Sequence, residues 1–131
     1  MKPIKKVLLV DDSEASNEMN KYVLEAAEIC DKIDIAKNGL LALEYLKSNL
    51  KSLPELIFLD VKMPVMNGFE FLDELQKYEQ KLNNTFVIVM LSSSLSPIDI
   101  NKSKEYPYVK EYLNKPLSIK KVKEIVKSIQ T

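Results

Sequence analysis

The residues of this chain that could do chemistry are carboxylates, hydroxyls and lysines, because histidine is absent and Cys30 is the single cysteine. Without histidine there can be no histidine-based triad or general base, and one cysteine alone makes a structural zinc site implausible. Five candidates share one feature, which is that each closely follows an apolar run: Asp11, Asp12, Asp60, Ser92 and Lys115. Chemistry at these positions must use carboxylates, a hydroxyl, an amine and hard cations.

Three of these candidates are carboxylates, and placing them together needs a physical reason. If Asp11, Asp12 and Asp60 lie side by side, their charges repel and at least one pKa rises. A hard divalent cation resolves the conflict, and Mg²⁺ typically binds one or two carboxylates together with water and phosphate oxygens. Taken singly, the acidic pair is also typical of a helix start, and Lys115 of a solvated surface. Their joint placement at strand ends favours a Mg²⁺ site.

The elements that must position these residues are five strands. Three runs are continuous and rich in branched residues, which is typical of strands buried on both faces: Val7–Val10, Leu56–Leu59 and Phe86–Leu91. Two runs mix apolar and charged residues, which favours the edges of a sheet: Ile33–Ile35 and Val109–Leu113.

Helical spacing follows each run, in Met19–Cys30, Ala42–Leu50, Phe69–Leu75, a segment starting at Ser96-Pro97, and Ile119–Ile129. The first stripe contains Met19, Tyr22 and Val23, and we assign Cys30 a packing role at its end. Strands alternating with helices predict an α/β fold with a doubly wound, flavodoxin-like parallel sheet in the order 2-1-3-4-5. Such sheets bind ligands at the carboxyl ends of strands 1 and 3, where the candidates lie.

Length and charge narrow the class of protein. The 131 residues suit one domain, so we expect a single domain over 1–131 with no output domain. The 19 basic and 19 acidic residues cancel, so no global charge attracts nucleic acid or an anionic membrane. No window approaches a signal peptide or a membrane span, and we therefore expect a cytoplasmic protein.

Three motifs resemble the receiver domains of two-component response regulators, in particular single-domain, chemotaxis-regulator-like members. They are Val7–Ser13, Leu59–Gly68 and Tyr112–Pro116, and the stretch from Asp60 to Gly68 is the most specific of them. The resemblance covers essentially the whole chain. It implies a protein that is not an enzyme beyond its own Mg²⁺-dependent phosphorylation and dephosphorylation.

The resemblance also implies a role for each matching residue. Asp60 is implied to attack phosphorus in a phosphohistidine donor and to become an aspartyl phosphate. Asp12 is implied to bind Mg²⁺ directly, Asp11 largely through water, and Lys62 through its backbone carbonyl. Lys115 is implied to neutralise phosphoryl oxygens.

Further implied features concern signalling. Ser92 matches a switch hydroxyl and Tyr112 a switch aromatic, although Tyr112 could also simply cover the core from an edge strand. The peptide bond before Pro116 is expected to be cis. The implied phosphodonor is a sensor histidine kinase or histidine phosphotransfer protein. A downstream protein would bind the face formed by the fourth helix, fifth strand and fifth helix of a monomer or weak dimer.

Three positions depart from the family pattern. Lys62 lies two residues after Asp60, where many relatives carry a polar or acidic residue, and it could alter dephosphorylation or donor choice. Tyr106-Pro107-Tyr108 precedes the fifth expected strand where relatives commonly have Gly-Ala, which leaves the local loop open. Ser93 replaces a frequent alanine with a small residue and little expected effect.

Three other functions compete with this interpretation. A phosphohydrolase with an aspartyl nucleophile would need a second aspartate at the position of Lys62. A flavodoxin-like cofactor binder would need a glycine-, threonine- or serine-rich loop in place of the acidic pair. An adaptor of the same fold that works without phosphorylation would bind no Mg²⁺.

Overall fold

The computed structural model describes residues 3–78, 86–93 and 95–130. Five parallel strands form one sheet in the order β2-β1-β3-β4-β5, which confirms the predicted doubly wound topology. The strands are β1 (Ile4–Val10), β2 (Cys30–Ala36), β3 (Leu56–Asp60), β4 (Val87–Ser92) and β5 (Val109–Asn114). As predicted, β1, β3 and β4 are the most buried, because each has a neighbour on both sides and helices above and below.

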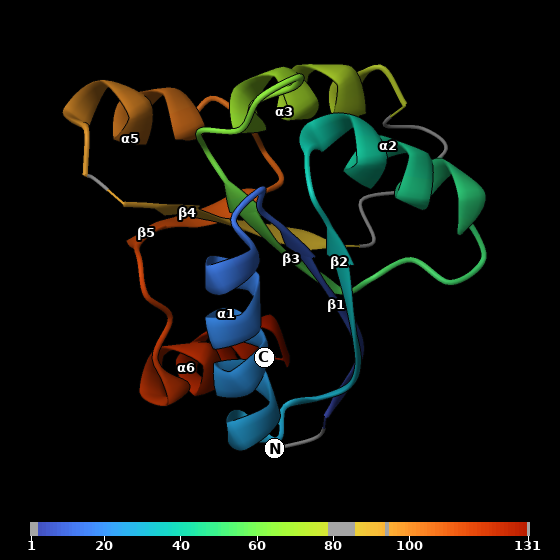
Figure 1. The fold of residues 1–131 in the computed structure, drawn as a ribbon, viewed down its shortest axis with the longest axis vertical. Coiled ribbons are helices and arrows are strands. Elements are labelled where there is room, and N and C mark those ends of the chain that lie inside the picture. The colour runs from blue at the N-terminus through green and yellow to red at the C-terminus, as the bar shows by residue number, and fades with distance from the viewer. Residues whose placement is uncertain (1–2, 79–85, 94, 131) are drawn as a thin grey trace.

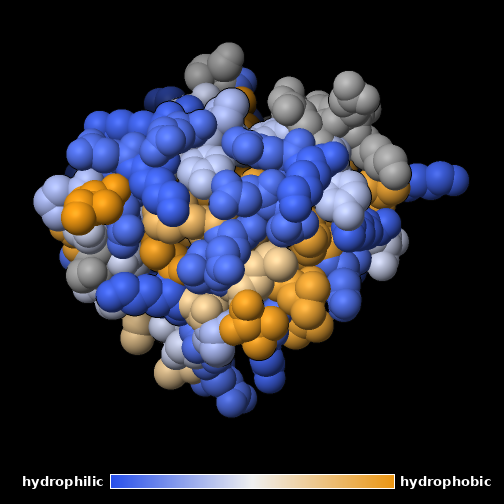
Figure 2. Space-filling view, turned by 90° about the horizontal axis from the view of Figure 1, so that it is seen from above, coloured by the Kyte–Doolittle hydropathy of each residue, from blue (hydrophilic) through white to orange (hydrophobic). Residues whose placement is uncertain are grey.

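Helices cover both faces of the sheet (Figure 1). On one face lie α1 (Glu14–Ala27) and α6 (Ile119–Gln130), and on the other lie α2 (Gly39–Ser48), α3 (Gly68–Gln76) and α5 (Pro97–Ser103). Figure 2 looks onto the second face, where hydrophilic residues predominate and hydrophobic residues gather toward the lower right. Among the described residues, no helix combines the length and apolar content needed to cross a bilayer.

Short polar side chains fix where the helices begin. Ser13, Asn38, Asn67 and Ser96 each accept a hydrogen bond from the backbone N–H three residues later, as helix N-caps do. At α3 the cap is reciprocal, because the Glu70 side chain accepts from the backbone N–H of Asn67. Since these helices follow parallel strands, their capped starts lie at the carboxyl edge of the sheet.

Helix α1 corrects part of the sequence interpretation. Met19 and Tyr22 are 55% and 72% exposed, whereas Asn17 and Asn20 are buried with Leu24 and Ala27. Cys30 does not end the helical stripe, because the helix stops at Ala27 and Cys30 begins β2, where it is half-buried. The apolar spacing was right for Val23 and Ala27, which pack on the core, and wrong for Met19 and Tyr22, because asparagines take part of the buried side.

Both tyrosines of the unusual Tyr106-Pro107-Tyr108 segment belong to the core, whereas Pro107 is exposed. Tyr106 and Tyr108 are both buried against the α2, α3 and α5 side of the sheet. The Tyr106 hydroxyl donates a 2.7 Å hydrogen bond to Asp73 Oδ1 on α3. Burial, and then this bond, raise the pKa of Tyr106 to about 12. The segment therefore ties the chain before β5 to α3.

Candidate functional site

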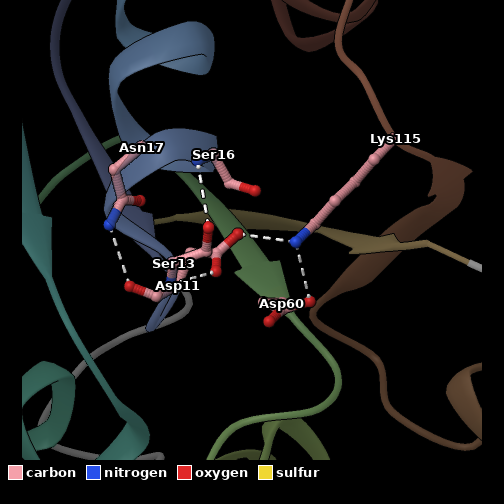
Figure 3. A network of polar contacts seen from close by, with 6 residues as sticks. All are labelled: Asp11, Ser13, Ser16, Asn17, Asp60 and Lys115. Atoms are coloured by element: carbon pink, nitrogen blue, oxygen red, sulfur yellow. Dashed lines mark hydrogen bonds and ion pairs between the residues drawn. The ribbon is translucent and has the colours of Figure 1, made fainter.

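Four predicted residues meet in one crevice at the carboxyl ends of the strands. Asp11 directly follows β1 and Asp60 ends β3, so the two lie on adjacent strands. Carboxylate oxygens of Asp11, Asp12 and Asp60 all lie within 4.8 Å of one another. Lys115 follows β5 and extends its side chain toward the same point (Figure 3).

Lys115 links the two buried carboxylates. Its Nζ lies 2.7 Å from Asp11 Oδ2 and 3.2 Å from Asp60 Oδ1. Its backbone N–H donates to the carbonyl of Ser92 at 2.8 Å, which fixes the start of the side chain against β4. The peptide bond between Lys115 and Pro116 is cis, as the resemblance implied.

Asp11 is held through every polar atom that it has. Its N–H donates to the Ala36 carbonyl, and its own carbonyl accepts from Asn17 Nδ2 at 2.9 Å. Its Oδ1 accepts from the Ser13 N–H at 2.9 Å, and its Oδ2 faces Lys115. Asn17 and Ser13 were not predicted to serve the site. Ser13 directly follows the acidic pair, and a serine in that place is a helix-cap signal that could have identified it.

The charges of the site do not balance. Three carboxylates face one ammonium group, and Asp11 and Asp60 are 3% and 6% exposed. Burial, and then the charge of Asp11, raise the pKa of Asp60 to about 6, although Lys115 opposes the shift. Burial alone would lower the pKa of Lys115. Its hydrogen bond to Asp11 and the charge of Asp60 outweigh burial and hold that pKa above the ordinary value.

This donor set suits a hard divalent cation. Carboxylate oxygens are the ligands that Mg²⁺ prefers, and added positive charge would relieve the repulsion that raises the pKa of Asp60. Asp12 is the exposed member of the three, so it leaves the site open to solvent on its side. The fit rests on oxygen chemistry and on the excess of negative charge.

The remaining predicted residues lie around the crevice. Ser92 is buried at the end of β4, where it pairs with Asn114 of β5. Tyr112 is half-buried and packs against the core on the α2, α3 and α5 side. Its hydroxyl is buried and makes no hydrogen bond to the described residues. Lys62 is exposed and lines a groove of about 550 Å³ with Met63, Phe69 and Asp99.

Comparison with known proteins gives concordant matches. A sequence profile described as the response regulator receiver domain matches residues 7–127. A two-component response regulator from Cytophaga hutchinsonii is similar in structure, with a TM-score of 0.92, 27% identity and 98% coverage of both chains.

Two further relatives are a response regulator with a metal-bound structure and a sensor histidine kinase. Response regulator Rcp1 from a Synechocystis strain is 29% identical, over 98% of this chain and 88% of that protein. A solved structure of the Mn²⁺-bound form of Rcp1 is 31% identical, with a TM-score of 0.72 and coverage of 96% of this chain and 91% of that one. The sensor histidine kinase CheAY of Helicobacter pylori is 31% identical over 92% of this chain, which spans 14% of that protein.

Proposed function

The chain belongs to the family of response regulator receiver domains, and on that premise we propose that Asp60 accepts a phosphoryl group from a phosphohistidine. The observation that carries this proposal is the meeting of Asp11, Asp12, Asp60 and Lys115 in one crevice. Receiver domains interact with sensor histidine kinases, and the likeness to part of a histidine kinase supports such a partner here.

In the proposed step a carboxylate oxygen of Asp60 attacks phosphorus, and an O–P bond forms. The P–N bond of the phosphohistidine breaks, and the imidazole nitrogen leaves with its electron pair. Such transfers depend on positioning and charge neutralisation more than on covalent chemistry. Lys115 contributes to positioning and to charge neutralisation. Its ammonium group contacts Asp60 and can pair with the phosphoryl oxygens as negative charge develops on them.

We also propose that Asp11, Asp12, Asp60 and the backbone carbonyl of Lys62 hold Mg²⁺. When bound, the ion supplies positive charge that the transferring phosphoryl group needs. The excess of carboxylates over ammonium groups supports this assignment, as does the Mn²⁺-bound form of Rcp1.

The output is proposed to be a protein contact that depends on phosphorylation. The Ser92 hydroxyl would donate a hydrogen bond to the new phosphoryl group. Rotation of Tyr112 would then change the face formed by α5, β5 and α6. A partner that binds the modified form more tightly shifts the population by that difference in affinity. On this proposal the chain acts only on itself. We still only predict that the chain is a single cytoplasmic domain. That it is a monomer or weak dimer also stays a prediction.

Intact-mass measurement tests the proposal. The protein is incubated with Mg²⁺ and acetyl phosphate, and then with phosphorylated histidine kinases. We expect the mass to increase by one phosphoryl group in the wild type and not in Asp60→Asn. Asp73→Asn is the matched control, because Asp73 lies on α3 outside the crevice. An unmodified wild type under all donors, or labelling that persists in Asp60→Asn, would rule the proposal out.

A further inference from the structure

Both glycines of the chain lie against the same short segment. We define the acceptor loop as residues 61–67, which join Asp60 at the end of β3 to Gly68 at the start of α3. The chain has two glycines, Gly39 and Gly68. Neither has a positive φ angle, so backbone conformation does not require glycine at either position.

Lack of space explains the glycines instead. A Cβ added to Gly68 would lie 2.6 Å from the carbonyl oxygen of Asp60. A Cβ added to Gly39 would lie 2.8 Å from both the carbonyl oxygen and Cγ of Met66. Gly68 starts the helix that follows the acceptor loop, whereas Gly39 reaches the loop from a different part of the chain.

Gly39 also donates a hydrogen bond to the acceptor loop. Its N–H lies in the first turn of α2, where backbone donors lack a partner within the helix, and it donates to the Met66 carbonyl at 3.2 Å. The positive end of the α2 dipole faces the same carbonyl. The loop is further closed by the bond from the Gly68 N–H to the Val61 carbonyl, at 2.9 Å.

The acceptor loop needs such support because its backbone is strained. Val65 has a φ of 75°, which is unfavourable for a β-branched residue, and the Met66 N–H donates to the Pro64 carbonyl across it. Val65 is 76% exposed, so packing of its own side chain does little to stabilise this turn. Strained conformations persist where the surroundings over-determine them.

We propose that Gly39 is a positioning residue for the Asp60 site. Its N–H and its missing side chain let α2 hold the acceptor loop close to the sheet, and with it the Lys62 carbonyl. This inference rests on the proposed function, because it concerns the Mg²⁺ site of that function. The loop starts one residue after Asp60 and is closed at both ends, so a shift of Met66 is transmitted to Lys62.

The test compares Gly39→Ala with Asn38→Ala. Asn38 caps the same helix through its Oδ1, which accepts from the Leu41 N–H at 2.8 Å. Asn38→Ala weakens the start of α2 without placing an atom against Met66. Mg²⁺ affinity is measured by isothermal titration calorimetry on unphosphorylated protein, and fold stability by urea unfolding.

We expect Gly39→Ala to weaken Mg²⁺ binding about tenfold, the low end of what a supporting residue costs a metal site. Asn38→Ala should keep wild-type affinity despite lower stability. Labelling by acetyl phosphate should slow in Gly39→Ala at low Mg²⁺ and recover at high Mg²⁺. If Gly39→Ala does not fold, the double variant with Met66→Ala takes its place, because it removes the Cγ contact.

Equal Mg²⁺ affinity in Gly39→Ala and wild type would overturn the inference, and so would an equal loss in Asn38→Ala. Either result leaves the proposed function intact as long as the wild type binds Mg²⁺ and is labelled. A wild type that binds no Mg²⁺ would instead contradict the proposed function.

Discussion

Strand β1 has a buried charged site near each of its ends, and the two sites differ in whether the protein balances their charges. Near the amino end, Lys6 is 8% exposed, and its Nζ donates to the Ser52 carbonyl at 2.9 Å and to the Ser52 hydroxyl at 3.1 Å. The same Nζ lies 5.6 Å from the centre of the Tyr45 ring. At the carboxyl end, Asp11 lies with the carboxylates of Asp12 and Asp60, and the one ammonium group, that of Lys115, contacts Asp11 and Asp60.

The difference shows where a ligand can act. At the amino end, one charge is met by neutral acceptors and a ring of the protein itself, so nothing further is required. At the carboxyl end, negative charge exceeds positive charge, and the pKa of Asp60 is raised to about 6 as a result of burial and its neighbours. A buried charge is therefore not by itself a sign of function, whereas an unbalanced one is a reason to look for an ion.

The largest expected effect comes from removing the cation that contacts both Asp11 and Asp60, in Lys115→Met. We expect labelling by acetyl phosphate to slow by about 10²–10³-fold, because a preorganised charge partner is lost in the transition state. Lys121→Met is the control, since Lys121 pairs with Glu111 away from the crevice. A Lys115→Met variant that is labelled as fast as Lys121→Met would show that the ammonium group between Asp11 and Asp60 is not needed for labelling.

The next effect concerns the stability of the metal-free protein. The folded state holds a proton on Asp60 more tightly than the unfolded state, because its pKa is raised from 3.8 to about 6. Stability from this residue is therefore present below pH 4 and lost as pH rises through 6. In EDTA at pH 7.5, the free energy of unfolding of Asp60→Asn should exceed that of the wild type by up to about 3 kcal/mol. Urea unfolding from pH 4 to 7.5 measures this gain, and a pH-independent difference would contradict it.

The smallest effect is expected at the amino end. Lys6→Met removes the hydrogen bonds to Ser52 but also avoids burying a charge, so the free energy of unfolding should fall by about 1 kcal/mol. Mg²⁺ affinity and labelling should remain those of the wild type, which calorimetry and intact mass can check. A loss of Mg²⁺ binding in Lys6→Met would show that the two ends of β1 are coupled.

Most of the fold follows from local sequence patterns. Continuous apolar runs identified the three central strands, and charges within Val109–Leu113 identified an edge strand. Parallel strands end at one edge of a sheet, so residues at the ends of β1, β3 and β5 lie along that same edge. That is why the convergence of Asp11, Asp60 and Lys115 could be predicted before any contact was seen.

Other features depend on contacts that periodicity cannot express. Asn17 is buried because its amide serves the Asp11 carbonyl, so the inner side of α1 is partly polar while Met19 lies outside. Tyr106 can be buried because its hydroxyl donates a hydrogen bond to Asp73, which lies 33 positions away in the sequence. Gly39 is needed because Met66 lies against it, and a glycine at the start of a helix does not by itself identify the group that packs there.

The strand order has a consequence for how copies of this protein can meet. The open edges of the sheet are β2 and β5, and both present charged residues: Asp31, Lys32 and Asp34 on β2, and Lys110 and Glu111 on β5. A second chain adding its own strand to either edge would have to place its side chains beside these charges. Growth into fibrils by edge pairing is thereby disfavoured.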